Sequence, residues 1–291
     1  MEDRNQLPPP PPPPIYPVTS DIPPDSPYHQ SPAPNRRTRD GGILSGLVAA
    51  LAAAWAYGKY ALLLAFKIPA ATTLISLVVS FGAYAVFFGP WFAVALVTMI
   101  LVHEMGHVVE IRRQGMPATA PIFIPFVGAA IFQRSHPTDA FKQALIGIAG
   151  PIAGTLGASV AFVLFAATQN EVYLLAAWIG FYINLFNLLP VGMLDGGWIL
   201  APVSKWFQVG GYALLAVGAI FFHFFVSPLL IVIALLGIPT LIQRFRMSDD
   251  PYYTSVPASS RWVLGAAWLG LVIYLGWASL QANSLLAGFA Q

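Results

Sequence analysis

The sequence predicts an all-α polytopic membrane protein with about six to seven transmembrane helices. Three observations predict it: 57% of the residues are hydrophobic, only 9% are charged, and the mean hydropathy is +0.69. Soluble proteins contain about 25% charged residues on average. One globular core could not bury this much apolar surface, so lipid must cover the rest. The composition excludes a soluble enzyme and makes the lipid bilayer an expected partner.

The apolar segments can be compared with the roughly 20 residues that a helix needs to cross the hydrocarbon. Segments expected to cross, as three hairpins and a last helix, are 68–88 with 91–111, 142–168 with 172–189, 208–226 with 229–243, and 262–282. The earlier stretch 43–66 is interrupted by Lys59 and bounded by Lys67. We expect it to lie in the membrane plane with its lysines reaching the interface, the alternative being a further span.

The first 41 residues form a separate region. They hold 13 of the 26 prolines, including the run Pro8–Pro14, and few large apolar residues. Such a segment cannot bury enough surface to offset its chain entropy, so we expect a disordered cytoplasmic tail at 1–41 before a membrane-embedded domain at 42–288. A polyproline II segment could dock an SH3-like or WW-like partner, although a spacer is the simpler interpretation. No apolar segment follows Met1, which predicts that there is no cleavable signal peptide.

The 14 Lys and Arg residues predict the orientation, because positive residues accumulate in cytoplasmic loops. If 1–41 is cytoplasmic and 43–66 does not cross, all 14 fall on one side, and the opposite side carries Glu171. We expect a protein of a prokaryotic-type plasma (inner) membrane with the basic side in the cytoplasm. The formal charge of +2 comes without a basic patch, so nucleic acid is not an expected partner.

Ionisable residues inside a membrane span are costly and therefore indicate function. His103, Glu104 and His107 form a His-Glu-x-x-His pattern near the end of segment 91–111. A spacing of four puts both imidazoles on one helix face, where they can hold a metal ion, and the Glu beside them can act as a general base. Glu104 lies about 12 Å along the helix from Arg112, within the bilayer near the predicted cytoplasmic face. The structural alternative is a pair of neutral histidines hydrogen-bonded to neighbouring helices.

A second polar cluster, Asn187–Gly197, ends an apolar helix at a proline and places Asp195 before two glycines. The chain contains no cysteine, so a metal must be held by His and carboxylate groups. Catalytic zinc takes three protein ligands and leaves a fourth position open, a set that His103, His107 and Asp195 would complete. The two glycines would let the backbone approach the metal-binding helix. Taken alone, Asp195 could instead be a helix N-cap.

Both clusters resemble motifs of the site-2 protease family of intramembrane zinc metalloproteases. The motifs are His103-Glu104-Met105-Gly106-His107 and Asn187-x-x-Pro190-x-x-x-Leu194-Asp195-Gly196-Gly197. The resemblance extends to Phe123–Ala129 and Gly150–Gly154, and it covers roughly residues 68–205, the expected catalytic core. It implies that His103, His107 and Asp195 bind one zinc ion and that Glu104 is the catalytic base. It also implies hydrolysis of a peptide bond in or near a transmembrane segment of a membrane-protein substrate.

Some positions depart from the family pattern. Met193 stands where many members have proline, which we expect to matter little, and no segment is long and polar enough for a PDZ or CBS domain. Gly154 stands where many have asparagine, which leaves a polar contact to substrate unassigned. Asn184 and Asn187, on one helix face, are the replacement candidates. Hydrogen bonding between helices explains them about equally well.

Two further features are assigned no chemistry. The glycines at 147, 150, 154 and 157 share one helix face, which we interpret as close helix packing. His136 and His223 have no metal-ligand partner at helical spacing and are interpreted as non-catalytic.

The segment Pro121–Ile131 is rich in Ile, Phe and Val and lies between Arg113 and Arg134. It resembles the short membrane-reentrant β-hairpin that the family places after its metal helix, and it could enter the membrane and return without crossing. A helical substrate hides its carbonyls in intrahelical hydrogen bonds, so a strand edge could pair with the unwound substrate. Phe126 and Gly128 are the expected substrate contacts. The alternative is an interfacial loop that does not contact substrate.

Two other functions use the same residues. A membrane metal-binding or transport protein would hold a travelling ion, but transporters tend to contain repeated broken helices, and neither motif has a second copy. An inactive relative would bind membrane segments without cutting them, although every catalytic residue type is present. Ligand type and resemblance favour zinc, while iron and cobalt also suit two histidines and a carboxylate.

Overall fold

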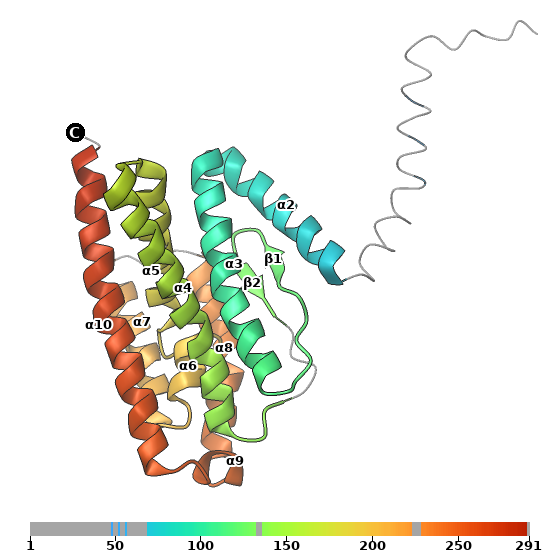
Figure 1. Ribbon diagram of the computed structural model, residues 1–291. Coiled ribbons are helices and arrows are strands. Elements are labelled where there is room, and N and C mark those ends of the chain that lie inside the picture. The colour runs from blue at the N-terminus through green and yellow to red at the C-terminus, as the bar shows by residue number, and fades with distance from the viewer. Residues whose placement is uncertain are drawn as a thin grey trace, which may run out of the picture. The chain divides into compact units, whose positions relative to one another are not determined.

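The computed structural model describes residues 69–131, 136–222 and 228–289, together with positions 48, 52 and 56 (Figure 1). Its elements are α2 (Pro69–Phe88), α3 (Pro90–Arg113), β1 (Ile122–Ile124), β2 (Gly128–Ala130), α4 (Ala140–Thr168), α5 (Glu171–Asn187), α6 (Asp195–Leu200), α7 (Trp206–Phe222), α8 (Pro228–Arg246), α9 (Pro251–Thr254) and α10 (Ala258–Phe289). The chain divides into two units, Met1–Lys59 and Tyr60–Gln291, and the second contains all these elements. The expected tail at 1–41, most of the expected helix at 43–66 and His223 lie outside the described residues.

Local sequence explains where the long helices begin and end. α3 begins at Pro90, whose missing N–H does no harm in a first turn, after Gly89 turns the chain with a φ of 87°. α4 begins after Asp139, whose side chain accepts a hydrogen bond from the Lys142 amide. It ends at Gln169, which takes the left-handed conformation with a φ of 56°. The hairpins predicted from the apolar segments therefore turn at positions with local stop and start signals.

The centre of the fold is a bundle in which α4 and α5 pack against each other and against α3 and α10 (Figure 1). Its core is apolar, and the largest fully buried side chain, that of Phe181, lies there together with Leu174 and Ile199. Ile199 belongs to the six-residue helix α6, which packs against α4, α7 and α10. The short helix α6, which begins at Asp195, is thus held inside a bundle of long apolar helices.

Four described helices are long and apolar enough to cross a membrane: Ala70–Phe88, Pro90–Arg113, Ala140–Thr168 and Ala258–Phe289. The helical membrane fold predicted from composition is therefore confirmed. α5 and α7 have 17 residues each and α8 has 19, close to the roughly 20 that a span needs. The count of six to seven spans stays a prediction.

A two-stranded hairpin lies within the predicted segment Pro121–Ile131. β1 and β2 pair in antiparallel fashion, with Phe123 opposite Ala129, and the turn is closed by a hydrogen bond from the Val127 N–H to the Ile124 carbonyl. Phe123 is buried in an apolar cluster with residues of α3, and Figure 1 shows the hairpin between α2 and α3. The depth of this hairpin in the membrane stays a prediction.

Side chains of α2 hold the outer edge of β1. Three hydrogen bonds make this contact: Phe123 N–H to Ser76 Oγ at 3.0 Å, Thr73 Oγ1 to the Pro121 carbonyl at 2.7 Å, and Phe126 N–H to the Tyr84 hydroxyl at 2.9 Å. Phe126 also makes edge contacts with the rings of Tyr84 and Phe87. β1 is therefore covered on one edge by β2 and on the other by α2.

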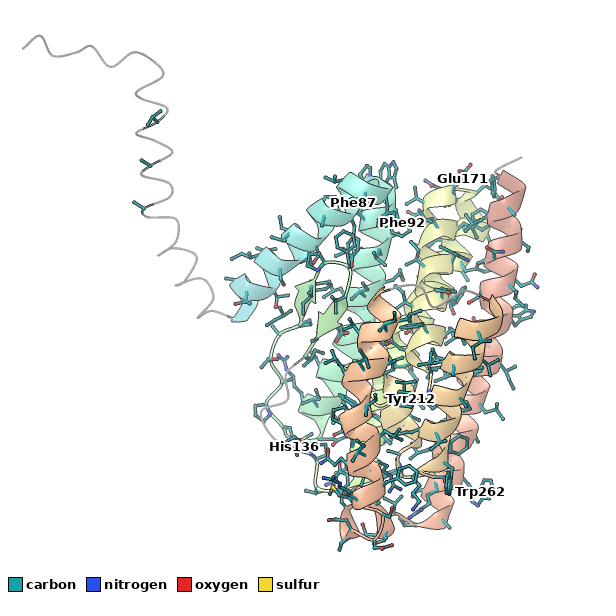
Figure 2. The ribbon with its side chains drawn as sticks, turned by 180° about the vertical axis from the view of Figure 1, so that it is seen from behind. Phe87, Phe92, His136, Glu171, Tyr212 and Trp262 are labelled. Carbon is teal, nitrogen blue, oxygen red and sulfur yellow. The ribbon has the colours of Figure 1, made fainter. Side chains whose placement is uncertain are left out.

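Charged residues gather at one end of the helices. Basic residues at or near helix termini there are Arg112, Arg113, Lys142, Lys205, Arg244, Arg246 and Arg261. Figure 2 shows Glu171 at the opposite end from His136 and Trp262. This separation agrees with the expected charge distribution. Which end faces the cytoplasm stays a prediction.

Candidate metal centre

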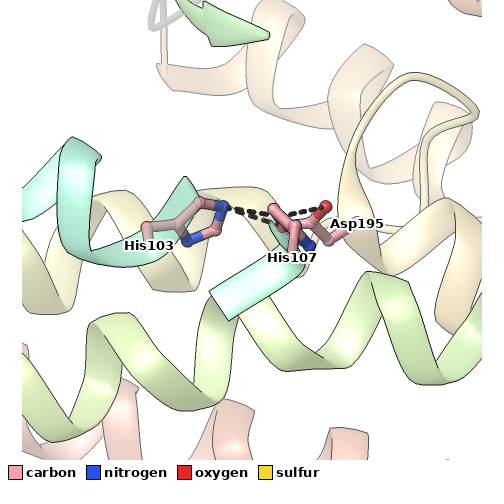
Figure 3. Close-up of side chains that lie close together, drawn as sticks. All are labelled: His103, His107 and Asp195. Atoms are coloured by element: carbon pink, nitrogen blue, oxygen red, sulfur yellow. Dashed lines mark hydrogen bonds and ion pairs between the residues drawn. The ribbon is translucent and has the colours of Figure 1, made fainter. Parts of the chain in front are cut away.

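Three polar side chains from two distant segments meet inside the bundle (Figure 3). His103 and His107 lie one turn apart on α3, and their Nε2 atoms are 3.2 Å apart. Asp195 brings its Oδ2 to 3.1 Å from the His103 Nε2 and its Oδ1 to 3.3 Å from the His107 Nε2. All three residues are buried, with 3%, 7% and 8% of their surface exposed. The structure thus joins the two motifs that the sequence holds far apart.

The hydrogen bonds behind the imidazoles define their tautomers. The His107 Nδ1 lies 2.7 Å from the Ile146 carbonyl, which can only accept, so the Nδ1 carries the proton. The His103 Nδ1 lies 2.8 Å from the Asn184 Oδ1, which likewise accepts. A neutral imidazole carries one N–H, so both Nε2 atoms are left with lone pairs facing Asp195.

Three lone-pair donors pointing at one another repel unless a cation lies between them. The Asp195 Oδ2 is buried and accepts no hydrogen bond among the described residues. One atom from each of the three side chains lies within 4.8 Å of the others, a spacing suited to one metal ion. Two neutral imidazoles and a carboxylate form an open zinc donor set, with a position left for a non-protein ligand. The residues fit a zinc ion.

Asp195 begins α6 and does not cap it. Leu194 occupies the N-cap position of α6, and the helix has no side-chain cap hydrogen bond. The N-cap alternative for Asp195 is therefore wrong, and its carboxylate is directed to the imidazoles instead.

Glu104 lies beside the metal-binding group on the same turn of α3. It is buried, with 9% of its surface exposed, and it interacts electrostatically with His103, His107 and Asp195. A carboxylate held next to a metal site in a largely apolar environment can take a proton from water and pass it on. The placement agrees with the catalytic role expected for this residue.

Two glycines of α4 make room for the centre. A Cβ at Gly150 would collide with the ring of His107, and a Cβ at Gly154 would collide with the amide of Asn184. The interpretation of these glycines as close helix packing is confirmed, and at Gly150 and Gly154 the groups that pack closely belong to the candidate centre. Gly147 instead faces Trp198 and Ile199 of α6.

The glycines after Asp195 have a different role from the expected one. A Cβ at Gly196 would collide with the Leu188 carbonyl, and one at Gly197 with the Val191 carbonyl. Both glycines therefore let α6 fold back onto the loop that precedes it, and the expected approach to the metal-binding helix is wrong. The sequence alone could not identify the neighbour, because only the tertiary fold decides which backbone lies opposite.

Three side chains from later helices hold the segment that carries Asp195. Each donates a hydrogen bond to a backbone carbonyl: Trp268 Nε1 to Leu188 at 2.8 Å, Gln208 Nε2 to Gly197 at 3.3 Å, and Arg244 Nε to Ala201 at 2.9 Å. The Arg244 guanidinium also lies 3.9 Å from the ring centroid of Tyr253. Burial raises the pKa of the Tyr253 hydroxyl, so the ring beneath the cation stays neutral.

None of these three residues was predicted from the sequence to contribute to the site. Gln208 and Arg244 are buried polar side chains at the ends of apolar helices, which is the signal that could have found them. Trp268 offers no such signal, because tryptophan is common in membrane helices.

The other predicted site residues occupy different surroundings. Asn184 is fully buried against His103, while Asn187 is half-buried and donates a hydrogen bond to the carbonyl of Ile183 in its own helix. Phe126 and Gly128 lie in the hairpin turn and β2, with φ angles of 63° and 126°. His136 is exposed in a loop at the basic end (Figure 2).

Comparison with known proteins agrees with this geometry. Residues 91–173 and 167–210 match the sequence model of peptidase family M50. Over these residues, which make up less than half of the chain, it is similar to peptidase family M50, the site-2 protease family. Two relatives, each described as "Putative zinc metalloprotease Rip3", come from Mycobacterium tuberculosis strains Erdman and H37Rv and are 31% identical to this chain over 135 residues. The alignment covers 44% of this chain and 34% of each relative, so it spans about a third of their length.

The M50 match includes both motifs of the centre. His103, Glu104, His107 and Asp195 all lie between residues 91 and 210, as does the β1–β2 hairpin. Arg244 and Trp268, which hold the Asp195 segment, lie outside the matched residues. The family resemblance inferred from the sequence motifs is confirmed.

Proposed function

We propose that this protein is a zinc-dependent intramembrane endopeptidase of the M50 type. It would hydrolyse peptide bonds in or near transmembrane segments of other membrane proteins. The observation that carries the proposal is the convergence of the Nε2 atoms of His103 and His107 and the buried carboxylate of Asp195 within a bundle of apolar helices. The match of residues 91–210 to the M50 model and the name of the mycobacterial relatives support zinc and proteolysis.

His103, His107 and Asp195 would hold the ion, with both imidazoles kept in the required tautomer by their Nδ1–H bonds. A zinc ion bound there supplies Lewis acidity, which polarises the scissile carbonyl and makes water more acidic. Glu104 takes the proton of the attacking water and delivers it to the leaving amine nitrogen. The apolar helices around the site exclude bulk water from the other faces of these groups.

The hairpin offers a strand edge to an unwound substrate. Because the Phe123 N–H points outward to Ser76, its partner Ala129 also directs its N–H and C=O away from the hairpin, toward the outer edge of β2. Among the described residues, no backbone hydrogen bond outside the hairpin involves the N–H or the C=O of Ala129. We infer that substrate backbone pairs with β2, since α2 already covers β1.

The hairpin is close enough to the centre for this role. Phe123 and Ala129 belong to an apolar cluster with Ile100 and Leu101 of α3, directly before His103. A substrate strand on β2 would therefore run past the turn of α3 that carries the candidate metal ligands. Phe126 and Gly128 are the proposed contacts of the hairpin, and Asn187 is the proposed polar contact of α5.

The test compares the membrane proteomes of cells that produce the wild-type chain with those that produce Glu104→Gln. We expect membrane-protein fragments whose new termini lie in or next to a transmembrane segment, present with the wild type and missing with the variant. Adding a zinc chelator to isolated wild-type membranes should stop fragment production. If fully metal-loaded wild type yields no such fragments, the endopeptidase proposal is wrong.

A metal transport function makes the opposite forecast. Wild-type protein in sealed vesicles would move zinc across the bilayer, and Glu104→Gln would leave this movement intact. The M50 match favours the peptidase.

A further inference from the structure

We propose that Asn184 is a positioning residue that fixes the tautomer and the ring orientation of the candidate metal ligand His103. The inference deepens the proposed function and rests on its metal site. Asn184 lies in α5, and none of its surface is exposed. Its Oδ1 lies 2.8 Å from the His103 Nδ1, across the interface between α5 and α3.

The amide can face His103 in only one way. Its Nδ2 donates a 2.6 Å hydrogen bond to the Gly180 carbonyl, one turn earlier in α5, and that carbonyl cannot donate in return. The Oδ1 must therefore be the atom that faces His103, and the His103 Nδ1 must carry the proton. The Nε2 is then obliged to present a lone pair to Asp195.

His107 is oriented by the backbone carbonyl of Ile146, which no substitution removes. His103 depends on a side chain instead. Among the described residues, Asn184 is thus the side chain that determines which ring nitrogen of His103 carries the proton. Partners of this kind contribute roughly 10-fold to 100-fold to metal affinity in known metal sites.

Gly154 connects α4 to the same arrangement. A Cβ at Gly154 would collide with both the Oδ1 and the Nδ2 of Asn184, so any larger residue displaces the amide from His103. Gly154, Asn184 and His103 therefore form one row across α4, α5 and α3. A larger residue at Gly154 therefore displaces the amide of Asn184, and a displaced amide no longer orients the ring of His103.

This assignment differs from the substrate contact expected for Asn184. Both ends of the amide are engaged and the residue is fully buried, so it has no group to offer to a substrate backbone. Asn187 lies one turn further along α5 and also donates a hydrogen bond to a carbonyl of its own helix. Among the described residues, its side chain makes no hydrogen bond to a candidate metal ligand. It serves as the matched control for metal affinity.

The experiment measures zinc affinity by chelator competition and the visible absorption of the cobalt(II)-substituted protein. Asn184→Leu keeps the number and branching of the side-chain atoms but cannot accept from His103, so we expect zinc affinity about 10-fold to 100-fold weaker and a changed cobalt spectrum. Asn184→Asp keeps the acceptor toward His103 and loses only the donor to the Gly180 carbonyl, so it should lose less affinity than Asn184→Leu. Asn187→Leu should bind zinc like the wild type. Asn184→Ala replaces the leucine variant if that variant does not fold.

A second comparison tests the row through Gly154. Gly154→Ala should weaken zinc binding although every candidate ligand is intact, because the added methyl displaces the amide. In an Asn184→Ala background the same change should cost no further affinity, since the group it displaces is already gone. Additive losses would contradict the assignment.

The possible failures can be told apart. Wild-type protein without zinc affinity would remove the proposed metal site and, with it, this inference. Wild-type protein that binds zinc, together with unchanged affinity and cobalt spectrum in Asn184→Leu, would overturn the inference and leave the proposed function standing. Equal losses in the leucine and aspartate variants would indicate a packing role and would also overturn it.

Discussion

Gly150 contributes to the centre by having no side chain. It faces the ring of His107, whose Nδ1 is held by the Ile146 carbonyl and whose Nε2 must point at Asp195. A methyl group at this position has no space unless the imidazole rotates away. Close backbone approach is therefore a condition for the metal-binding geometry, in addition to the ligands themselves.

Gly150→Ala should abolish or strongly weaken zinc binding while the helices remain folded. The physical reason is the overlap between the new Cβ and the His107 ring. Zinc content and circular dichroism of the detergent-purified variant check this. Gly276→Ala is the matched control, because nothing lies within 4 Å of a Cβ added there. Normal zinc content in Gly150→Ala would contradict the account.

Much of the centre could be predicted from the sequence, because its chemistry is encoded locally. The four-residue spacing of His103 and His107 puts both on one helix face, and Asp195 is a carboxylate in an otherwise apolar and glycine-rich context. Asn184 and Gly150 could be noticed but not given their roles. Those roles depend on which helix faces which, and the contacting residues are 81 and 43 positions apart in the chain (184 − 103 and 150 − 107).

Among the elements, α6 depends most on its neighbours. It has only six residues and no side-chain cap, so it cannot be stable alone. Donors from α7, α8 and α10 bind carbonyls along the segment that contains it, from Leu188 to Ala201. These later helices therefore help to hold Asp195 at the imidazoles.

Trp268→Phe should lower the stability of the folded protein by about 1 kcal/mol, because the Leu188 carbonyl loses its indole N–H donor. It should also weaken zinc binding, since the segment before Asp195 becomes less firmly held. Thermal unfolding in detergent and chelator competition measure the two effects. Trp277→Phe, at an exposed position of the same helix, should change neither. Equal behaviour of the two variants would rule out the bracing role.

The β1–β2 hairpin contains a glycine, Gly128, whose backbone conformation supports a further prediction. Gly128 has a φ of 126°, which a residue with a Cβ adopts only at a cost of about 1–3 kcal/mol. Gly128→Ala should therefore distort β2 and reduce cleavage of membrane substrates at least several-fold, with zinc content unchanged. Gly82→Ala in α2 is the control, since a Cβ there meets no atom within 4 Å. Undiminished cleavage by Gly128→Ala would favour a hairpin without substrate contact.

Helix boundaries were predictable to within a few residues, because apolar length and capping residues are local properties. Predicted segment 91–111 became Pro90–Arg113, and 142–168 became Ala140–Thr168. The α6 helix was not predicted, because a six-residue helix leaves no periodic pattern. Its close contact with the preceding loop arises only in the folded chain.

For the molecule as a whole, the charge distribution makes a directional forecast. Basic residues lie at the end that contains Trp262, and Glu171 lies at the other end. If the basic end is cytoplasmic, the candidate metal centre lies nearer to that side, because His107 is close to the end of α3 that carries Arg112 and Arg113.

Cysteine labelling tests this orientation cleanly, because the chain has no cysteine of its own. In intact cells, a membrane-impermeant maleimide should label Glu171→Cys and should leave Trp262→Cys unlabelled until the membrane is broken. Both side chains are exposed, so access through the membrane is the property that differs. The reverse labelling pattern would place the basic end outside.

The central claim is that two distant motifs form one zinc site. Elemental mass spectrometry of the purified protein tests it directly, comparing wild type with His107→Ala, Asp195→Ala and Glu104→Gln. We expect about one zinc per chain in the wild type and in Glu104→Gln, and little or none in the two ligand variants. A well-folded wild type that holds no zinc after supplementation, or ligand variants that keep their zinc, would show that the two motifs do not form one zinc site.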